Sequence, residues 1–501
     1  MAAIPHLHDE LESSPRIHVD TNYGTITGGR AENGAAVFLE VPYALPPLRF
    51  QDPKPLPPDF RYENKEYTRE STYAFQPTND GQDKVGYGEP SENPLFLNIV
   101  CPPSFPTTQE KFPVKVYIHG GFLQFGSPHS LGSQAQYISA VRSEVWINIG
   151  YRLSAFGFLA CDTPSVSGNF GFKDQWLALE WIKENVAAFG GDPENIQITG
   201  LSAGAHAVHQ LLHRASHLPP GLKAPFHSAV LQSNSMVSDP KRPSDLRPQF
   251  AALCNALSID ATSPDALSAL STIPASPTPS ASNTAPSAVL LDGDWLPISP
   301  SPMEWQHSGA FATALREKGV RSILVGDLTE EWYLYSIAHP ISGAEDIAPN
   351  LRRYYPSGMV DELVKMYPKL GEEAKEEEVQ RRFGEILSDS QVHLPVRMLV
   401  RDLHAAGFPV LRYEIRWVPE RKEGYVTHGG DRALWAFREI AKNWLQRVHE
   451  EVEAVESADK PLRGPKSILV LTEDGGNTIE WAEDDKWDEK MRLVGAVGEK
   501  V

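Results

Sequence analysis

The sequence predicts an α/β protein, and two stretches of the chain carry that prediction. Ile196 to Thr199 is a short β-branched run, Gly200-Leu201-Ser202-Ala203-Gly204 follows it, and residues 205–212 contain neither Gly nor Pro. The order of strand, turn and helix is typical of a nucleophile elbow, in which a serine occupies a sharp turn. Upstream, Val114 to Ile118 alternates like a buried strand and leads into His119-Gly120-Gly121-Phe122.

These glycines suit a reactive serine and an oxyanion loop. Gly200 and Gly204 leave room where a side chain would collide with the neighbouring strand or the entering helix. Backbone N–H groups reach a developing oxyanion only where the main chain is bare, which accounts for Gly120 and Gly121. The N–H of Ala203 would be a third donor. Taken separately, the first motif is common by chance, and the second fits an ordinary turn after a strand equally well. Their combination favours an acyl-transfer site.

Five further blocks resemble the type-B carboxylesterase and cholinesterase branch of the α/β-hydrolases. They are Phe38 to Ala44 with Pro46, Pro47, Arg49, Phe50 and Pro53; Ser91 to Asn98; Tyr151 to Leu153 with Phe156 to Leu159; Gly168 to Gly171 with Asp174 and Gln175; and Phe189 to Pro193. The resemblance implies the α/β-hydrolase fold, with a large, mostly parallel central sheet flanked by helices and with helical insertions. It also implies one domain over residues 1–501.

The resemblance also implies a carboxylate and a histidine, because a serine hydroxyl is a weak nucleophile until a histidine takes its proton. Ile323 to Gly326 reads as a buried strand, and the segment after it stands where the family shows Asp-Glu-Gly. Glu331 is the matching acid in that segment. Its neighbours Asp327 and Glu330 stay open as alternatives, because the sequence does not show which carboxylate faces inward.

The block from Tyr425 to Asp431 resembles the family's His-Gly block, so His428 is the expected base. Ser202, Glu331 and His428 then follow one another in the chain order of the α/β-hydrolases. The reaction implied is hydrolysis of a carboxylic ester through an acyl-serine intermediate, with no metal and no organic cofactor.

One departure concerns the oxyanion loop, where the family commonly reads His-Gly-Gly-Gly-Phe and this chain has Phe122 at the third glycine. If the loop keeps its path, the N–H groups of Gly121 and Phe122 act with Ala203, and Phe122 must be extended because a positive φ is costly for it. If the loop slips by one residue, Gly120 and Gly121 donate. The slipped loop is favoured.

A neutral ester, such as that of a natural product, is the expected small-molecule substrate. Leu201 stands where the family commonly has glutamate, and residues 75–94 contain no tryptophan to bind a quaternary ammonium. Two other classes stay open: an acyltransferase or cyclase using the same acyl-enzyme, and a non-catalytic, cholinesterase-like interaction protein.

The composition of the chain limits the classes of binding partner and indicates a cellular location. A formal net charge of −19 argues against nucleic acid and anionic membranes as partners. The N-terminus lacks the apolar core of a signal peptide, no run is long enough for a membrane span, and the cysteine number, 3, is odd. We therefore expect a cytoplasmic protein without structural disulfides.

Three segments complete the expectations. The histidines His206, His209, His213 and His217 share a helix face, but a metal site is disfavoured because no carboxylate or cysteine lies nearby. A flexible loop rich in Pro and Ser is expected around residues 274–287. Near the C-terminus we expect a helix from Trp444 to Val455, a strand from Ser467 to Thr472 and a mostly exposed terminus over residues 473–500.

Overall fold

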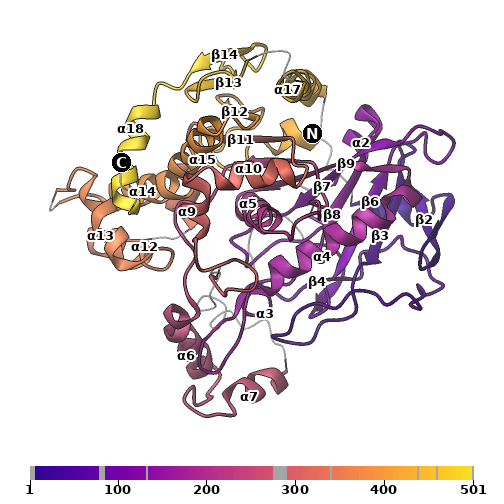
Figure 1. Ribbon diagram of the computed structural model, residues 1–501, viewed down its shortest axis with the longest axis horizontal. Helices are drawn as coiled ribbons and strands as arrows, with labels where there is room; N and C mark the ends of the chain where they lie inside the picture. Colours follow the sequence, from indigo (N-terminus) through magenta and orange to yellow (C-terminus); the bar gives the residue numbers. More distant parts are fainter. Residues whose placement is uncertain are drawn as a thin grey trace. The chain divides into compact units, whose positions relative to one another are not determined.

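The computed structural model describes residues 6–77, 85–130, 134–274, 290–338, 341–371, 373–436, 439–457 and 461–498 (Figure 1). The chain divides into two compact units. The N-terminal unit comprises Met1–Ala229, Pro240–Pro302 and Lys318–Val320, and the C-terminal unit comprises Val230–Asp239, Met303–Glu317 and Arg321–Val501. Of the expected loop around residues 274–287, only Pro274 belongs to the described part of the chain.

The N-terminal unit is built on a mixed sheet. Its neighbouring strands are β1 (Arg16–Thr21), β2 (Gly24–Arg30), β3 (Ala36–Pro42), β6 (Phe96–Cys101), β8 (Val145–Ile149), β7 (Phe112–Ile118) and β9 (Gly191–Leu201). The pairs from β1 to β8 are antiparallel, whereas β7 runs parallel to both β8 and β9. Because β7 and β9 are parallel neighbours, the loops that follow them leave the sheet at the same edge.

The N-terminal unit also contains helices, turns and a short two-stranded ribbon. They are α1 (Leu7–Leu11), α2 (Gln136–Arg142), α3 (Ser154–Phe158), α4 (Phe170–Asn185), α5 (Ala203–Ser216), α6 (Arg247–Ala256), α7 (Ala266–Thr272), the turns η2 (Val186–Phe189) and η3 (Pro243–Leu246), and the ribbon of β4 (Thr72–Ala74) and β5 (Glu89–Ser91). Most side chains of α5 are buried, as its run of Ala, Val and Leu requires. The strand predicted over Val114 to Ile118 and the helix predicted after Gly204 are both confirmed.

The C-terminal unit has its own strands and helices. The strands are β11 (Ser322–Leu328), β12 (Val410–Ile415), β13 (Ser467–Leu471) and β14 (Ile479–Glu483), and β10 (Ser228–Gln232) falls at the boundary of the two units in sequence. The helices and turns are α9 (Pro302–His307), α10 (Ala310–Glu317), α11 (Trp332–Ala338), η4 (Ala344–Asp346), α12 (Ile347–Leu351), α13 (Ser357–Lys365), α14 (Glu376–Ser388), η5 (Asp389–His393), α15 (Leu394–Ala405), α16 (Arg432–Ala436), α17 (Glu439–Glu456), α18 (Trp487–Met491) and η6 (Arg492–Val497).

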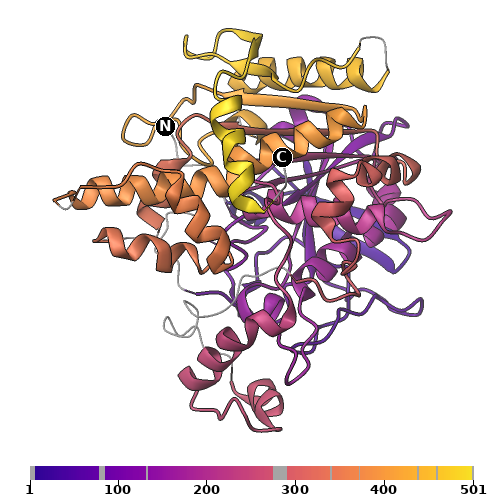
Figure 2. The same ribbon diagram turned by 60° about the vertical axis from the view of Figure 1, so that its left-hand side comes forward.

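Strands β11, β12 and β13 are parallel, and β14 closes a hairpin with β13. The helix α17 lies beside these strands (Figure 2), and its Trp444 packs in one hydrophobic cluster with Tyr413 and Leu469. The helix and strand predicted from Trp444 and Ser467 are confirmed, the helix being longer than expected. The terminus over residues 473–500, expected to be mostly exposed, contains β14, α18 and η6, and its Asp484 and Trp487 are buried.

Candidate active site

Ser202 stands at a strained turn between β9 and α5. Its backbone has φ 61° and ψ −127°, although the residues on either side belong to a regular strand and a regular helix. A Cβ added to Gly200 would collide with the backbone of Gly204, and one added to Gly204 would collide with the carbonyl oxygen of Ile118. Such strain persists only where the surroundings impose it and is typical of functional sites. The predicted elbow geometry is confirmed.

The glycine loop after β7 lies directly against this serine. A Cβ added to Gly120 would come within 3.0 Å of the Ser202 Cβ and would collide with the Leu201 carbonyl oxygen. The loop and the elbow therefore touch through bare backbone. Ala203 is the first residue of α5, so its N–H has no acceptor within the helix. Backbone donors from two segments thus lie beside one serine.

His119 holds the Gly120 peptide in a fixed orientation. Its Nδ1 lies 3.0 Å from the Gly120 carbonyl oxygen, and its ring stacks on Tyr151 with 4.5 Å between ring centres. Burial lowers the pKa of His119 to about 4, so the ring is neutral and Nδ1–H donates this hydrogen bond. The Gly120 carbonyl and the Gly121 N–H belong to one planar peptide and point in opposite directions. His119 consequently directs the Gly121 N–H away from itself.

Phe122 has a left-handed backbone conformation, which bears on the two paths predicted for the oxyanion loop. Its φ is 56° and that of Leu123 is 59°, both in the left-handed region. The N–H groups of Gln124 and Phe125 each donate to the Gly121 carbonyl oxygen at 2.9 Å and close a turn around these residues. The extended Phe122 that an unshifted loop required is therefore not observed. An extended Phe122 belonged to the unshifted loop, which was not the favoured alternative, and the hydrogen bonds of the turn hold Phe122 in the left-handed region despite its intrinsic preference.

In the C-terminal unit, Glu331 and His428 form a close pair. Glu331 Oε2 lies 2.6 Å from His428 Nδ1, and Glu331 Oε1 accepts a hydrogen bond from the Leu328 N–H at 2.9 Å. Both side chains are buried, Glu331 completely. The other ring nitrogen of His428, Nε2, has no hydrogen-bond partner among the described residues of its own unit. A carboxylate on Nδ1 and an unused Nε2 are the arrangement that a general base needs.

The two alternative acids have other partners. Asp327, in β11, binds Arg412, Arg397 and His393. Glu330 accepts the Val426 N–H at 2.8 Å through Oε2, and its own N–H donates to the Val426 carbonyl. Among these three carboxylates, Glu331 alone contacts His428 in the described hydrogen bonds. Glu330 joins the segment after β11 to the segment that carries His428, whereas the partners of Asp327 lie in β12, α15 and η5.

Two residues near the pair escaped the sequence analysis. Asp431, three positions after His428, is buried and accepts a hydrogen bond from the Trp435 indole N–H at 2.8 Å. Burial raises the pKa of Asp431 to about 6, with the nearby charge of Glu331 adding to the shift. The ring of Tyr335 lies 5.5 Å from that of His428. No sequence signal distinguishes a buried aspartate of this kind from an exposed one.

Two of the four histidines that the sequence places on one helix face are buried in the structure. His209 and His213 are buried with 4.9 Å between their ring centres. Within the residues that the structure describes, no group of three or more His, Cys, Asp or Glu side chains is placed to hold a metal ion. Over the same residues, no helix combines the length and apolarity that crossing a bilayer requires.

The chain is similar to known esterases over most of its length. The model of the carboxylesterase family matches residues 15–443. An uncharacterized esterase/lipase of Schizosaccharomyces pombe is 30% identical over 91% of each chain, and a carboxylic ester hydrolase of Gibberella moniliformis is 28% identical over 91% of this chain and 90% of its own. The solved structure of a PNB esterase superposes with a TM-score of 0.73 at 21% identity, covering 95% of this chain and 99% of the other.

The fold class is the α/β-hydrolase fold, as the sequence predicted. The chain belongs to the carboxylesterase family and is a carboxylic-ester hydrolase.

Proposed function

We propose that the chain hydrolyses neutral carboxylic esters through a triad of Ser202, Glu331 and His428. The observation that carries the proposal is the 2.6 Å contact between Glu331 Oε2 and His428 Nδ1, in a chain whose strained elbow carries a serine. A carboxylate on Nδ1 fixes the tautomer in which Nε2 accepts a proton. Ser202 is the nucleophile that this proton transfer activates.

In the proposed reaction, His428 Nε2 takes the proton from Ser202 Oγ while Oγ attacks the ester carbonyl carbon. The tetrahedral intermediate collapses when His428 protonates the leaving alcohol, and an acyl-serine is left. Water, deprotonated by His428, attacks the acyl-serine and releases the acid. Glu331 stays ionised and stabilises the imidazolium in both halves of the reaction.

Backbone N–H groups of Gly120, Gly121 and Ala203 are proposed to stabilise the oxyanion. The contact of Gly120 with the elbow supports this choice, as does the His119 hydrogen bond that orients the Gly121 N–H. Such donors act on charge that exists only in the transition state, so each contributes directly to the rate. No metal or organic cofactor takes part in this scheme.

The substrate is proposed to be a small neutral ester, with a natural-product ester as one candidate. Leu201, which precedes the serine, offers no negative charge to a cationic alcohol. A location in a reducing compartment is also part of the proposal, supported by Cys101, Cys161 and Cys254, which are all buried and free.

The test combines covalent labelling with a matched serine variant. A fluorophosphonate probe should label Ser202, as read by peptide mass spectrometry, and Ser202→Ala should lower aryl-ester turnover by roughly 10³–10⁶-fold. Ser216→Ala is the control, since Ser216 is the last residue of α5, the helix that Ser202 precedes, and donates to the His213 carbonyl oxygen at 2.7 Å. Labelling at another residue, or a turnover unaffected by Ser202→Ala, would refute the assignment.

Ester assays with added alcohols or amines separate hydrolysis from acyl transfer. Mass detection of the free acid as the main product supports the hydrolase, whereas acylated acceptor as the main product indicates a transferase. Absence of any turnover on simple aryl esters would favour an interaction protein.

A further inference from the structure

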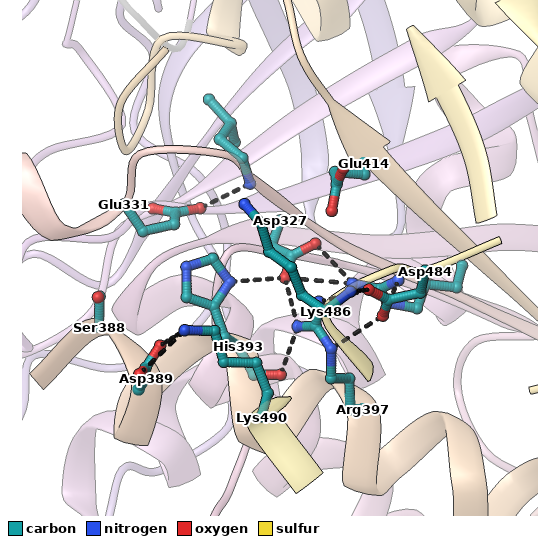
Figure 3. Close-up of polar contacts among 12 residues, drawn as sticks. Asp327, Glu331, Ser388, Asp389, His393, Arg397, Glu414, Asp484, Lys486 and Lys490 are labelled. Atoms are coloured by element: carbon teal, nitrogen blue, oxygen red, sulfur yellow. Dashed lines mark hydrogen bonds and ion pairs between the residues drawn. The ribbon is translucent and has the colours of Figure 1, made fainter. Parts of the chain in front are cut away.

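The carboxylate of Asp327 is surrounded by three cationic or proton-donating side chains from different elements (Figure 3). Arg412 Nη2 of β12 donates to Asp327 Oδ1 at 3.0 Å, and Arg397 Nη1 of α15 donates to Oδ2 at 3.1 Å. His393 Nδ1, at the end of the π-helical turn η5, lies 2.9 Å from Oδ2. Asp327, Arg397 and Arg412 are completely buried. One side chain of β11 thus ties together a strand, a helix and a π-helical turn.

Asp484, from the segment after β14, closes the cluster on its other side. It receives a hydrogen bond from Arg397 Nη2 at 3.0 Å, and its Oδ2 lies 2.8 Å from Arg412 Nη1. Two carboxylates therefore face two guanidinium groups, and these four charges balance. Asp484 lies outside residues 15–443, the part that matches the family model. The C-terminal segment consequently contributes to a cluster centred on the strand that precedes Glu331.

The cluster is connected to Glu331 through a single peptide. Asp327 is followed in β11 by Leu328, and the Leu328 N–H donates to Glu331 Oε1 at 2.9 Å. The same carboxylate reaches His428 through Oε2. The Glu331 carboxylate is thus bonded to the Leu328 peptide, and Asp327, whose side chain has three partners, immediately precedes that peptide in β11.

We propose that Asp327 and Asp484, through Arg397 and Arg412, are positioning residues that hold Glu331 in register with His428. This inference rests on the proposed function, because it assigns the cluster a role in the reaction only if Glu331 is the triad acid. His393 completes the cage around Asp327 and shares this role.

Energetics favour a role in positioning over one in stability alone. Buried ion pairs rarely stabilise a fold more than apolar residues of similar size, because desolvation offsets most of their attraction. In some proteins such buried groups fix a single geometry, because a misplacement leaves a buried charge unpaired, and this is the role proposed for the cluster here. Burial raises the pKa of the Asp327 carboxyl, but Arg412, Arg397 and the His393 hydrogen bond outweigh burial and hold the pKa well below its usual range. Asp327 is therefore ionised and keeps its partners at working pH.

A double-mutant cycle on kcat tests the proposal. Asp327→Asn should lower kcat for an aryl ester by about 10–100-fold, because small misplacements of a catalytic group are costly, while KM changes little. In the Glu331→Gln background, the same substitution should change kcat by less than about twofold, because its effect passes through Glu331. His393→Gln and Asp484→Asn are milder changes to the same cluster. Each replaces Asp327→Asn in the cycle if that variant fails to fold.

Asp402→Asn is the matched control. Asp402 is a buried aspartate of the same unit that binds His307 Nδ1 at 2.8 Å and Arg401 Nε at 2.8 Å, and the described contacts do not connect it to Glu331. It should lower the melting temperature and leave kcat within about twofold, as a purely structural ion pair would.

The outcomes separate the two proposals. If Asp327→Asn lowers kcat equally in the wild-type and Glu331→Gln backgrounds, the positioning role of Asp327 is overturned. An unchanged kcat in a folded Asp327→Asn enzyme would overturn it as well. An unchanged kcat in Glu331→Gln alone would overturn the triad assignment itself, and the inference with it.

Discussion

Glu331 Oε2 lies 2.6 Å from His428 Nδ1, whereas the adjacent Glu330 bonds to the backbone of Val426. Two neighbouring carboxylates of the same type thus have separate tasks. One contacts an imidazole, and the other ties the loop after β11 to the loop that carries the histidine. This division gives a direct comparison by mutagenesis.

Glu331→Gln should lower kcat by roughly 10²–10⁴-fold, because a neutral amide neither fixes the Nδ1–H tautomer nor stabilises the imidazolium. Glu330→Gln is the matched control and should cost less than about threefold, because its amide oxygen still accepts the Val426 N–H. Steady-state kinetics on one aryl ester measures both. A larger loss in Glu330→Gln would show that the acid has been misassigned.

Local signals in the sequence were enough to predict the elbow and its strands. The β-branched run before Ser202, the spacing of Gly200 and Gly204 and the alternation of Val114 to Ile118 all act over a few residues. Their geometry depends on sterics between near neighbours, so the structure reproduces it.

Side-chain contacts between residues far apart in the sequence could not be predicted from such local patterns. The choice of Glu331 over Asp327 rested on a family resemblance, because side-chain direction after a strand depends on what packs around it. The cage around Asp327 joins residues of β12, α15, η5 and the C-terminal segment, and no local pattern relates them. The left-handed conformation of Phe122 was likewise not readable from intrinsic backbone preference, because it depends on the turn closed by the N–H groups of Gln124 and Phe125.

His119 should make stability depend on pH between about 4 and 6.5. Its pKa in the folded chain is about 4, below the ordinary histidine value of about 6.5. As pH falls through this window, the unfolded chain takes up a proton that the folded chain refuses, so the free energy of unfolding decreases. The contribution lost at pH 4.5 is about 2–3 kcal/mol.

Urea unfolding of wild type and His119→Asn at pH 7 and pH 4.5 measures this contribution. Asparagine offers an N–H near the position of Nδ1 but does not titrate, so the advantage of wild type should shrink by about 2–3 kcal/mol at the lower pH. If the free energy of unfolding falls equally in wild type and His119→Asn between pH 7 and pH 4.5, His119 titrates like an exposed histidine.

Asp431 should make stability depend on pH in the opposite direction to His119. Burial and the charge of Glu331 raise its pKa to about 6, so the folded chain keeps a proton that the unfolded chain releases above about pH 4. Stability is therefore lost as pH rises through this window. Asp431→Asn, which keeps an acceptor for Trp435, should raise the free energy of unfolding relative to wild type by about 2 kcal/mol more at pH 8 than at pH 4.5.

Asp402→Asn provides the contrasting control for Asp431. Burial raises the pKa of Asp402, but hydrogen bonds from His307, Arg401 and Gln306 outweigh it and leave the pKa below its usual value. Its ionised form therefore stabilises the fold, and this stability is lost as pH falls. Asp402→Asn should destabilise the chain, and more so at pH 8. The same sign of effect in both variants would contradict the pKa assigned to Asp431.

Phe122 allows backbone strain and ring bulk to be tested separately. A left-handed φ of 56° costs a bulky residue about 1–2 kcal/mol, and glycine removes that cost while losing about 0.5–1 kcal/mol through greater freedom in the unfolded chain. Phe122→Gly should therefore unfold with a free energy within about 1 kcal/mol of wild type. Phe122→Ala removes the same ring but keeps the strain, so it should be the less stable variant in urea unfolding.

Activity on a series of acetate esters completes the Phe122 experiment. If the ring crowds the reacting carbonyl beside Ser202, both variants should gain activity on esters of tertiary alcohols and keep most of their turnover on methyl and ethyl esters. Because Phe122→Gly and Phe122→Ala differ in backbone strain but share the missing ring, equal gains in the two attribute the effect to the ring. A uniform loss of turnover over the whole series would instead identify Phe122 as part of the pocket wall, whose removal weakens the binding of every ester. The crowding interpretation would then be abandoned.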